Sequence, residues 1–475
     1  MRQIYFRAST VIVWLGKKYE RYAEELPQLQ LFGCEGAAAT VTPEELESAG
    51  DAAESSSASS RLARELYEDE YWKRVWIVQE VGLAERLIVC FGTCVTDWVT
   101  FIRLLTVKNV GSNGPMKLND LRQRRYEGSR DFLQLLREYR DAECEKRRDK
   151  VYGLVGLASD VHFFPVDYRK SLFEIWRDVM IFANGHGLLA EDEIISVGGL
   201  VKYILMGAKC EPLDQMLRSY KPAQQDAVAL IEDPGSPQVF RVPAKVLGCV
   251  KNVSFRPDEI IDDPNKQEMW EQTVQRYYRK DAGRAHAESD MLLRMILRSG
   301  SQDPTTACFT YSSGVQWTES VYTRDQMLDI WVGNTINRLQ EMSNGQASAP
   351  ESNKPLESPA ETARLYQLEC FFGRNDWKMG IASAQVQLGD LICWVESSRM
   401  AVILRPRTDT YNFTFRAVGT AFVATDLRGI SISDHRERYK SFPQPRGPEK
   451  ANLPVHLDAT FLFILLDDAS LGKCS

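Results

Sequence analysis

The sequence lacks the features that mark several large classes of protein. No apolar run approaches the ~20 residues that a membrane-spanning helix needs; residues 11–15 and 461–466 are among the longest runs. The 58 lysine and arginine residues are outnumbered by 65 aspartate and glutamate residues, so the basic surplus typical of nucleic-acid-binding domains is missing. Ten cysteines scattered over 475 residues are too few for a disulfide framework. These absences predict a cytoplasmic protein with reduced thiols, no membrane span and no nucleic-acid partner.

Common catalytic and metal-binding motifs are missing as well. The five histidines are far apart and none lies in an HExxH pattern, which argues against a zinc protease. Cys90 and Cys94 have no second ligand pair at zinc-finger spacing, and Cys90 falls inside a predicted strand. The sequence contains no GxSxG, GxxxxGK[ST] or GxGxxG motif. We therefore expect no metal ion and no cofactor.

The N-terminal residues indicate part of a parallel α/β sheet. Apolar residues make up 44% of the chain, which is ample for buried cores. Residues 11–16 and 87–91 are short, β-branched apolar runs, a pattern typical of strands covered on both faces. Two strands make a poor sheet, and the helix predicted at residues 2–8 has no cap before it. The chain is therefore expected to begin inside a domain.

The remaining pattern is helical first and β-rich later. Helices are predicted at residues 61–83, 132–158, 270–278 and 291–297, and after a capping box formed by Ser171 and Glu174. Residues 36–60 and 343–359 are rich in small and polar side chains, which predicts an inserted loop and a flexible linker. Short alternating runs at 390–395, 400–404 and 411–423 predict antiparallel strands.

One predicted helix carries an unusual group of side chains. In YWKRVWIVQE, residues 71–80, Trp76 and Glu80 share a face because they are four residues apart, and Trp72 lies one turn earlier. Beside indole surface, desolvation favours the protonated acid, which makes Glu80 a candidate general acid/base or ribose-binding group. The alternative is that the tryptophans belong to a core and that Glu80 pairs with Arg74 or another cation.

The order of several sequence blocks resembles that of the fungal heterokaryon-incompatibility (HET) family. IYFRASTVIVWLG (residues 4–16) is similar to the family's IYxxAxxVxVWLG block, and WKRVWIVQEVGLAERLIVCFG (residues 72–92) to its WxxRxWxxQE block. RRDKVYGLVGLA and VDYRKS, at 147–158 and 166–171, resemble the segments that follow the domain, and LGDLICWVESSRMAVILRP, at 388–406, a C-terminal β element. The binding or structural motif positions implied by the resemblance are Trp14, Gly16, Trp72, Arg74, Trp76, Gln79, Arg148, Asp149, Tyr152, Gly389 and Asp390.

The resemblance implies a role in fungal non-self recognition, in which the HET domain triggers cell death. The domain is similar to TIR domains, which have a flavodoxin-like α/β fold, and some TIR domains cleave NAD with a helical glutamate in a WCxxE pattern. Trp76 and Glu80 have the same spacing, so the resemblance makes Glu80 the candidate catalytic residue. The family's opening YxALSYxWG and WIDxxCINQ blocks are missing, which implies truncation at the N-terminus.

The expected fold is α/β. It combines a partial flavodoxin/TIR-like parallel sheet at the N-terminus, a mostly helical middle and a small antiparallel β module at the C-terminus. We expect a truncated HET-like domain at 1–105, a helical segment packed on it at 106–200, a mixed and mainly helical region at 201–336, a flexible linker at 337–362 and the β module at 363–475.

The expected function is cell-death signalling by association with protein partners, including homotypic contact through the HET-like domain. We expect this chain not to act as an enzyme. A TIR-like enzyme that cleaves NAD with Glu80, and an inactive truncated remnant, are the alternatives.

Overall fold

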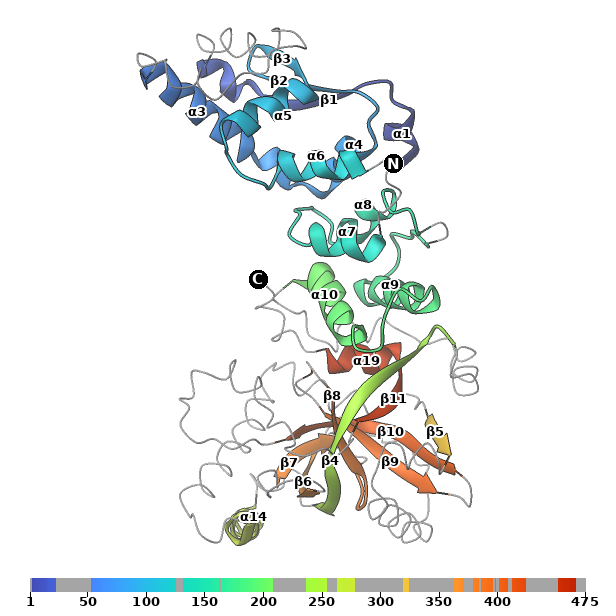
Figure 1. Ribbon diagram of the computed structural model, residues 1–475. Coiled ribbons are helices and arrows are strands. Elements are labelled where there is room, and N and C mark those ends of the chain that lie inside the picture. Colours follow the sequence, from blue (N-terminus) through green and yellow to red (C-terminus); the bar gives the residue numbers. More distant parts are fainter. Residues whose placement is uncertain are drawn as a thin grey trace, which may run out of the picture. The chain divides into compact units, whose positions relative to one another are not determined.

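The chain forms two compact units, Met1–Tyr168 and Arg169–Ser475 (Figure 1). The boundary lies inside the segment 106–200. The computed structural model describes residues 2–22, 53–124, 131–161, 164–207, 236–253, 263–277, 319–323, 363–370, 379–383, 386–395, 398, 401–408, 412–423 and 452–466. The predicted helix at 291–297, the linker at 337–362 and most of the loop at 36–60 lie outside these residues.

The first unit contains a three-stranded sheet in the order β1-β2-β3. Its strands are β1 (Val11–Gly16), β2 (Leu87–Phe91) and β3 (Cys94–Asp97). The two strands predicted from the sequence are confirmed and are parallel to each other, but β3 is antiparallel to β2, so the expected parallel sheet is in fact mixed. Gly92 allows the tight turn between β2 and β3, because its φ is +53° and an added Cβ would lie 2.9 Å from backbone atoms of Tyr19 and Glu20.

Only one face of this sheet is buried. Val11, Val13 and Leu15 of β1 are buried, whereas Ile12 and Trp14 between them are 62% and 51% exposed. The prediction that β1 is covered on both faces is therefore wrong. An unbroken apolar run does not distinguish a strand with two covered faces from one with a single covered face.

The long helices predicted in the first unit are divided into shorter ones, and residues 53–60, the end of the loop predicted at 36–60, are in fact helical. The helices of this unit are α1 (Arg2–Arg7), η1 (Lys17–Tyr22), α3 (Ala53–Tyr67), η3 (Glu70–Lys73), α4 (Val75–Leu83), α5 (Trp98–Val107), α6 (Pro115–Gln123), α7 (Phe132–Glu138) and α8 (Asp149–Val155). The single helix predicted at 61–83 is divided into α3, η3 and α4, because Asp69 caps η3 and Arg74 is extended and forms a β-bridge with Glu143. The helix predicted at 132–158 is likewise two helices, α7 and α8.

Aromatic side chains form much of the core on the covered side of the sheet. The ring of Trp72 lies 6.1 Å from that of Trp98 and 5.8 Å from that of Phe101, and Phe91 of β2 lies 6.2 Å from Phe101. The Trp72 indole N–H donates to the carbonyl of Leu66 at 2.7 Å, so its one polar atom is satisfied inside the core.

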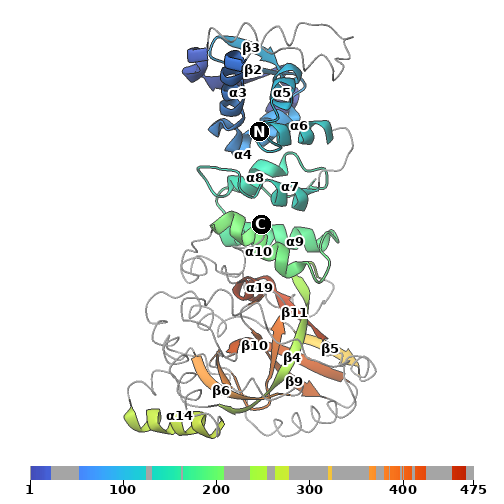
Figure 2. The same ribbon diagram turned by 60° about the vertical axis from the view of Figure 1, so that its left-hand side comes forward.

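Three helices of the second unit pack together, as Figure 2 shows. They are α9 (Leu172–Gly185), α10 (Ile194–Met206) and α19 (Ala459–Leu465). The capping box predicted at the start of α9 is confirmed, since the Ser171 hydroxyl accepts from the Glu174 N–H at 3.2 Å and the Glu174 carboxylate accepts from the Ser171 N–H at 2.7 Å. Trp176 of α9 contacts Phe463 of α19 at a ring distance of 4.8 Å.

The C-terminal β module is confirmed as antiparallel, but it is larger than expected. Within the described residues its eight strands are β4 (Val239–Val253), β5 (Glu319–Thr323), β6 (Ala363–Cys370), β7 (Met379–Ser383), β8 (Leu391–Val395), β9 (Ala401–Thr408), β10 (Asn412–Val423) and β11 (Asn452–Asp458). β4 and β5 come from the region expected to be mainly helical. Of that region's predicted helices, the one at 270–278 corresponds to α14 (Pro264–Tyr277).

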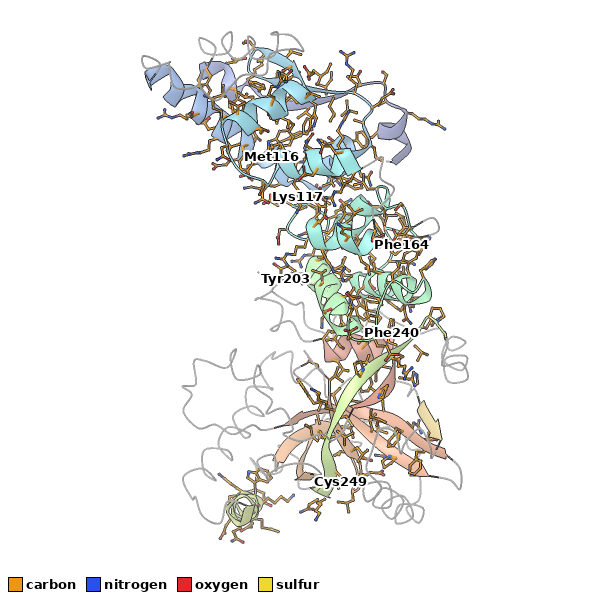
Figure 3. The ribbon with its side chains drawn as sticks, in the orientation of Figure 1. Met116, Lys117, Phe164, Tyr203, Phe240 and Cys249 are labelled. Carbon is orange, nitrogen blue, oxygen red and sulfur yellow. The ribbon has the colours of Figure 1, made fainter. Side chains whose placement is uncertain are left out.

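Six of these strands close into a barrel. The pairings run β4-β6-β7-β10-β9-β8, and β8 pairs again with β4, so the ring has no open edge (Figure 1). β4 makes this closure possible because its 15 residues are long enough to pair with β11, β8 and β6 in turn. Figure 3 labels Phe240 and Cys249 on β4, both of which are buried.

None of the helices in the described part of the chain is long and apolar enough to cross a membrane.

Candidate functional site

The motif residues of α4 hold this helix to α8. The amide N–H of Gln79 donates to the carbonyl of Gly153 at 2.7 Å, and the indole N–H of Trp76 donates to an Asp149 carboxylate oxygen at 3.3 Å. Gly153 allows this close approach of α4 and α8, since an added Cβ would lie 3.2 Å from a methyl group of Val75. These contacts make α8 part of the same structural unit as α4.

The same contacts continue from α8 into the segment before the unit boundary. The second Asp149 oxygen accepts from the Tyr168 hydroxyl at 2.7 Å, and the Tyr152 hydroxyl donates to the Asp167 carbonyl at 3.0 Å. The rings of Tyr152 and Tyr168 lie 5.2 Å apart. Burial and the hydrogen bond to Asp149 raise the pKa of Tyr168. Three blocks that are separate in the sequence, at 72–80, 147–158 and 166–171, are thus joined by side-chain hydrogen bonds.

Gln79 is the most deeply buried polar residue in this group. Its side chain is 2% exposed, and its Oε1 has no hydrogen-bond partner in the part of the chain that the structure describes. Gln79 points toward α8, whereas the neighbouring Glu80 points toward a different set of residues. The two adjacent motif positions therefore serve different purposes.

Glu80 lies between two tyrosine hydroxyls. Its Oε1 accepts from Tyr5 of α1 at 2.8 Å, and its Oε2 accepts from Tyr71 of η3 at 3.2 Å. Burial, the hydrogen bond to Glu80 and the negative charge of Glu80 raise the pKa of Tyr5 to about 12. The carboxylate is partly exposed, so it is held in a fixed orientation but is not sealed from solvent.

This arrangement corrects the expected surroundings of Glu80. Trp72 lies on η3 rather than on the helix of Glu80, and its indole is part of the aromatic core. Arg74 stands at the N-cap of α4 with its guanidinium 5.9 Å from the ring centroid of Tyr71, and no ion pair joins it to Glu80 among the residues described. Neither Trp72 nor Tyr5 could be placed from helical spacing, because both positions depend on contacts outside α4.

The other N-terminal motif residues shape the sheet and the start of α8. Trp14 lies on the exposed face of β1, and Gly16 ends this strand at φ +97°, with its carbonyl accepting from the Gly92 N–H at 3.0 Å. Arg148 is the N-cap residue of α8 and makes no side-chain capping bond there.

Gly389 and Asp390 hold three barrel strands together. Asp390 is fully buried, and its two oxygens accept from the Arg405 guanidinium of β9 at 2.9 and 3.0 Å. Gly389, at φ +86°, donates to the Val250 carbonyl of β4 at 2.8 Å, and Val250 donates back to the Asp390 carbonyl. Burial raises the pKa of Asp390, and the Arg405 charge opposes that rise. Sequence reasoning missed Arg405, although it lies in the same motif block.

Among the motif residues, Glu80 is the one placed for acid–base chemistry. No group of three or more potential ligands gathers in a way that could hold a metal ion within the described ranges. Glu80 is the one motif carboxylate that is partly open to solvent with both oxygens oriented, whereas Asp149 and Asp390 are buried and fully engaged. Any acid–base chemistry at the motif residues would therefore use Glu80.

Comparison with known families identifies the first part of this structure. Residues 1–80 match the family model described as Heterokaryon incompatibility protein (HET). The match begins at Met1 and ends at Glu80, inside the first compact unit, and it confirms the resemblance of the N-terminal blocks within residues 1–80. No curated protein and no solved structure matches the chain.

Proposed function

Starting from the HET domain at residues 1–80, we propose that this chain acts in heterokaryon incompatibility. It is a cytoplasmic protein that signals non-self recognition and cell death, and it works by associating with other protein molecules. The HET match is the observation that carries this proposal. The working module is the whole unit Met1–Tyr168, because the last helix of the match, α4, is bonded to α8 beyond it.

The surface of this unit supports association. Trp76, Gln79 and Asp149 are occupied by bonds within the unit, so they support the fold rather than a ligand. The exposed side of the sheet, in contrast, presents Ile12 and Trp14 to solvent. The largest contiguous apolar patch on a monomeric protein, typically about 300–600 Å², is often a functional interaction site.

A test of this proposal needs a variant that disrupts the first unit alone. We choose Val13→Asp, because Val13 is fully buried in β1 and an unpaired carboxylate there has no partner. Inducible expression of the natural chain in fungal cells should reduce the number of viable cells, and Val13→Asp should restore viability at equal protein level. Unimpaired growth with the natural chain, or equal killing by Val13→Asp, would contradict the proposal.

Cleavage of NAD by Glu80 is the second candidate function. The observation in its favour is that the carboxylate is partly exposed and is held on both sides by the hydroxyls of Tyr5 and Tyr71. A carboxylate fixed in this way can stabilise the oxocarbenium-like charge that develops on a ribose during glycosidic cleavage. Purified chain incubated with NAD tests this directly. Loss of NAD that disappears in Glu80→Gln would favour the enzyme, whereas stable NAD would favour association.

A further inference from the structure

The exposed side of the N-terminal sheet carries apolar side chains from all three of its strands. We propose that this outer face, formed by Ile12, Trp14, Ile88, Cys90 and Val95, is a weak self-association surface whose occupant is a second copy of this chain. The inference rests on the proposed function and gives its association step a surface and a partner.

Strand register places the five side chains together. Ile12 of β1 pairs with Ile88 of β2, and Trp14 pairs with Cys90. Cys90 in turn pairs with Val95 of β3. Side chains of paired residues lie on the same side of a sheet, and the intervening residues Val11, Val13, Leu87 and Val89 are all buried on the opposite side.

The composition of the outer face is that of an interface rather than of ordinary surface. Ile12 is 62%, Trp14 51% and Val95 63% exposed, and no charged side chain lies among the five residues. One charged residue shares this side of the sheet, because Asp97 pairs with Ile88 at the β3 edge of the outer face. The centres of protein interfaces are depleted of charge and enriched in aromatic residues, and tryptophan is among the commonest hot spots.

A second copy fits this surface for reasons of shape and charge. Two sheets can pack face to face at about 10 Å when their facing side chains are apolar, and a two-fold dimer brings the same patch of each copy together. Because the five residues are uncharged, such a contact places no like charges opposite each other at its centre. The outer face is therefore compatible with itself.

The size of the outer face indicates weak binding. Three side chains exposed by more than half and two partly exposed ones provide on the order of 400 Å² of apolar area in each copy. This is about half of the ~800 Å² per partner that stable complexes bury. We therefore expect a dimer that forms at high local concentration and dissociates on dilution.

Sedimentation velocity of the full chain, from about 5 to about 500 μM, tests the proposal. The weight-average mass of the natural chain should rise toward that of a dimer. Ile12→Arg, which places like charges in the centre of the contact, and Trp14→Ser should each weaken self-association at least tenfold. Both residues are more than half exposed, so the folded unit should tolerate these changes. Val107→Ser is the matched control, because Val107 is 65% exposed on α5, outside the outer face, and should leave self-association unchanged.

Two results would overturn the proposal: a natural chain that stays monomeric at 500 μM, or an Ile12→Arg variant that self-associates like the natural chain. Measuring the viability of cells that express each variant distinguishes failure of this inference from failure of the proposed function. If Ile12→Arg is monomeric and kills normally, self-association through the outer face is not the association step of signalling, which overturns this inference and leaves the signalling role standing. If the natural chain dimerises through this face without killing cells, the signalling role is wrong instead.

Discussion

Asp390 is a motif residue whose role lies in folding. Its carboxylate is completely buried and depends on Arg405 and one backbone N–H for its compensation. A buried ion pair adds little net stability over apolar residues of the same shape, but breaking it leaves an uncompensated charge. The effect of the Asp390–Arg405 pair on folding stability is therefore largest when one of the two residues is replaced and the other is kept.

Arg405→Met should destabilise the second unit by about 3–5 kcal/mol, because it leaves Asp390 buried without its counter-charge. The double variant Asp390→Leu/Arg405→Met should recover most of this loss. Chemical denaturation of the two variants and the natural chain measures both free energies. Equal stability of Arg405→Met and the natural chain would show that the pair contributes nothing.

Asp458 gives a prediction for pH. Its carboxylate caps α19 by accepting from the Phe461 N–H at 2.7 Å, and burial raises its pKa from 3.8 to about 6. The folded state therefore binds a proton more tightly than the unfolded state. The resulting stability is present below pH 4 and is lost as the pH rises through about 6.

Asp458→Asn keeps an N-cap acceptor and removes this pH-dependent loss. It should be more stable than the natural chain by on the order of 1 kcal/mol at pH 7.5, and the difference should shrink toward pH 4. Thermal unfolding at a series of pH values measures the difference. A gap that widens as the pH falls would have the wrong sign and would refute this role for Asp458.

At the scale of elements, the contact between α4 and α8 extends the first unit beyond residue 80. Gly153 permits this contact, because an added Cβ would lie 3.2 Å from Val75 and 3.9 Å from the ring of Trp76. Gln79 then bonds to the Gly153 carbonyl from the same helix as Trp76. The packing depends on the absence of a side chain at one position.

Gly153→Leu should overpack the contact and destabilise the first unit by ~1–3 kcal/mol. Gly153→Ala is the graded control, since its smaller clash is offset by about 1 kcal/mol of improved helix propensity. Urea unfolding followed by tryptophan fluorescence compares the two variants with the natural chain. An unchanged midpoint for Gly153→Leu would refute the contact.

The sequence predicts elements well where their cause is local. β1 and β2 have β-branched runs closed by glycine, and the cap of α9 is set by Ser171 and Glu174 alone. The break between η3 and α4 does not have a local cause, because a β-bridge to Glu143 holds Arg74 in an extended conformation. The closure of the barrel has no local cause either, because β4 precedes each of its partner strands, β6, β8 and β11, by more than a hundred residues.

In the candidate site, too, features with a local cause could be predicted from the sequence and features with a non-local cause could not. The position of Glu80 one turn after Trp76 is a property of α4 and could be read from spacing. The two hydroxyls that hold Glu80 come from α1 and η3, and no pattern within α4 points to either. Arg405, the partner of Asp390, lies in the same motif block and could have been found by asking what balances a buried carboxylate.

At the scale of the whole molecule, the chain has two units, each with a core of its own. Val13 lies in the core of Met1–Tyr168, and Trp176 lies in the core of Arg169–Ser475. Substitutions far apart with no shared partners act additively. Damage to one core should therefore leave the stability of the other unit unchanged.

Val13→Asp should accordingly abolish the protection of β1 and β2 in hydrogen exchange while the barrel strands keep theirs. The reason is that an unpaired buried carboxylate opposes folding of the sheet to which it belongs. Exchange followed by mass spectrometry resolves the two sets of peptides. Equal loss of protection in β8 and β9 would show that the two units do not fold independently.

The central proposal is that the unit Met1–Tyr168, which contains the HET match at residues 1–80, signals by association and not through chemistry at Glu80. The measurement that tests it most directly is the viability of fungal cells expressing Glu80→Gln, compared with cells expressing the natural chain at the same level. Glutamine preserves the size of the side chain and one oxygen acceptor between Tyr5 and Tyr71, so the fold should be retained. Association predicts equal killing by the two proteins. Survival of the Glu80→Gln cells, with the variant folded and present in full amount, would contradict the account.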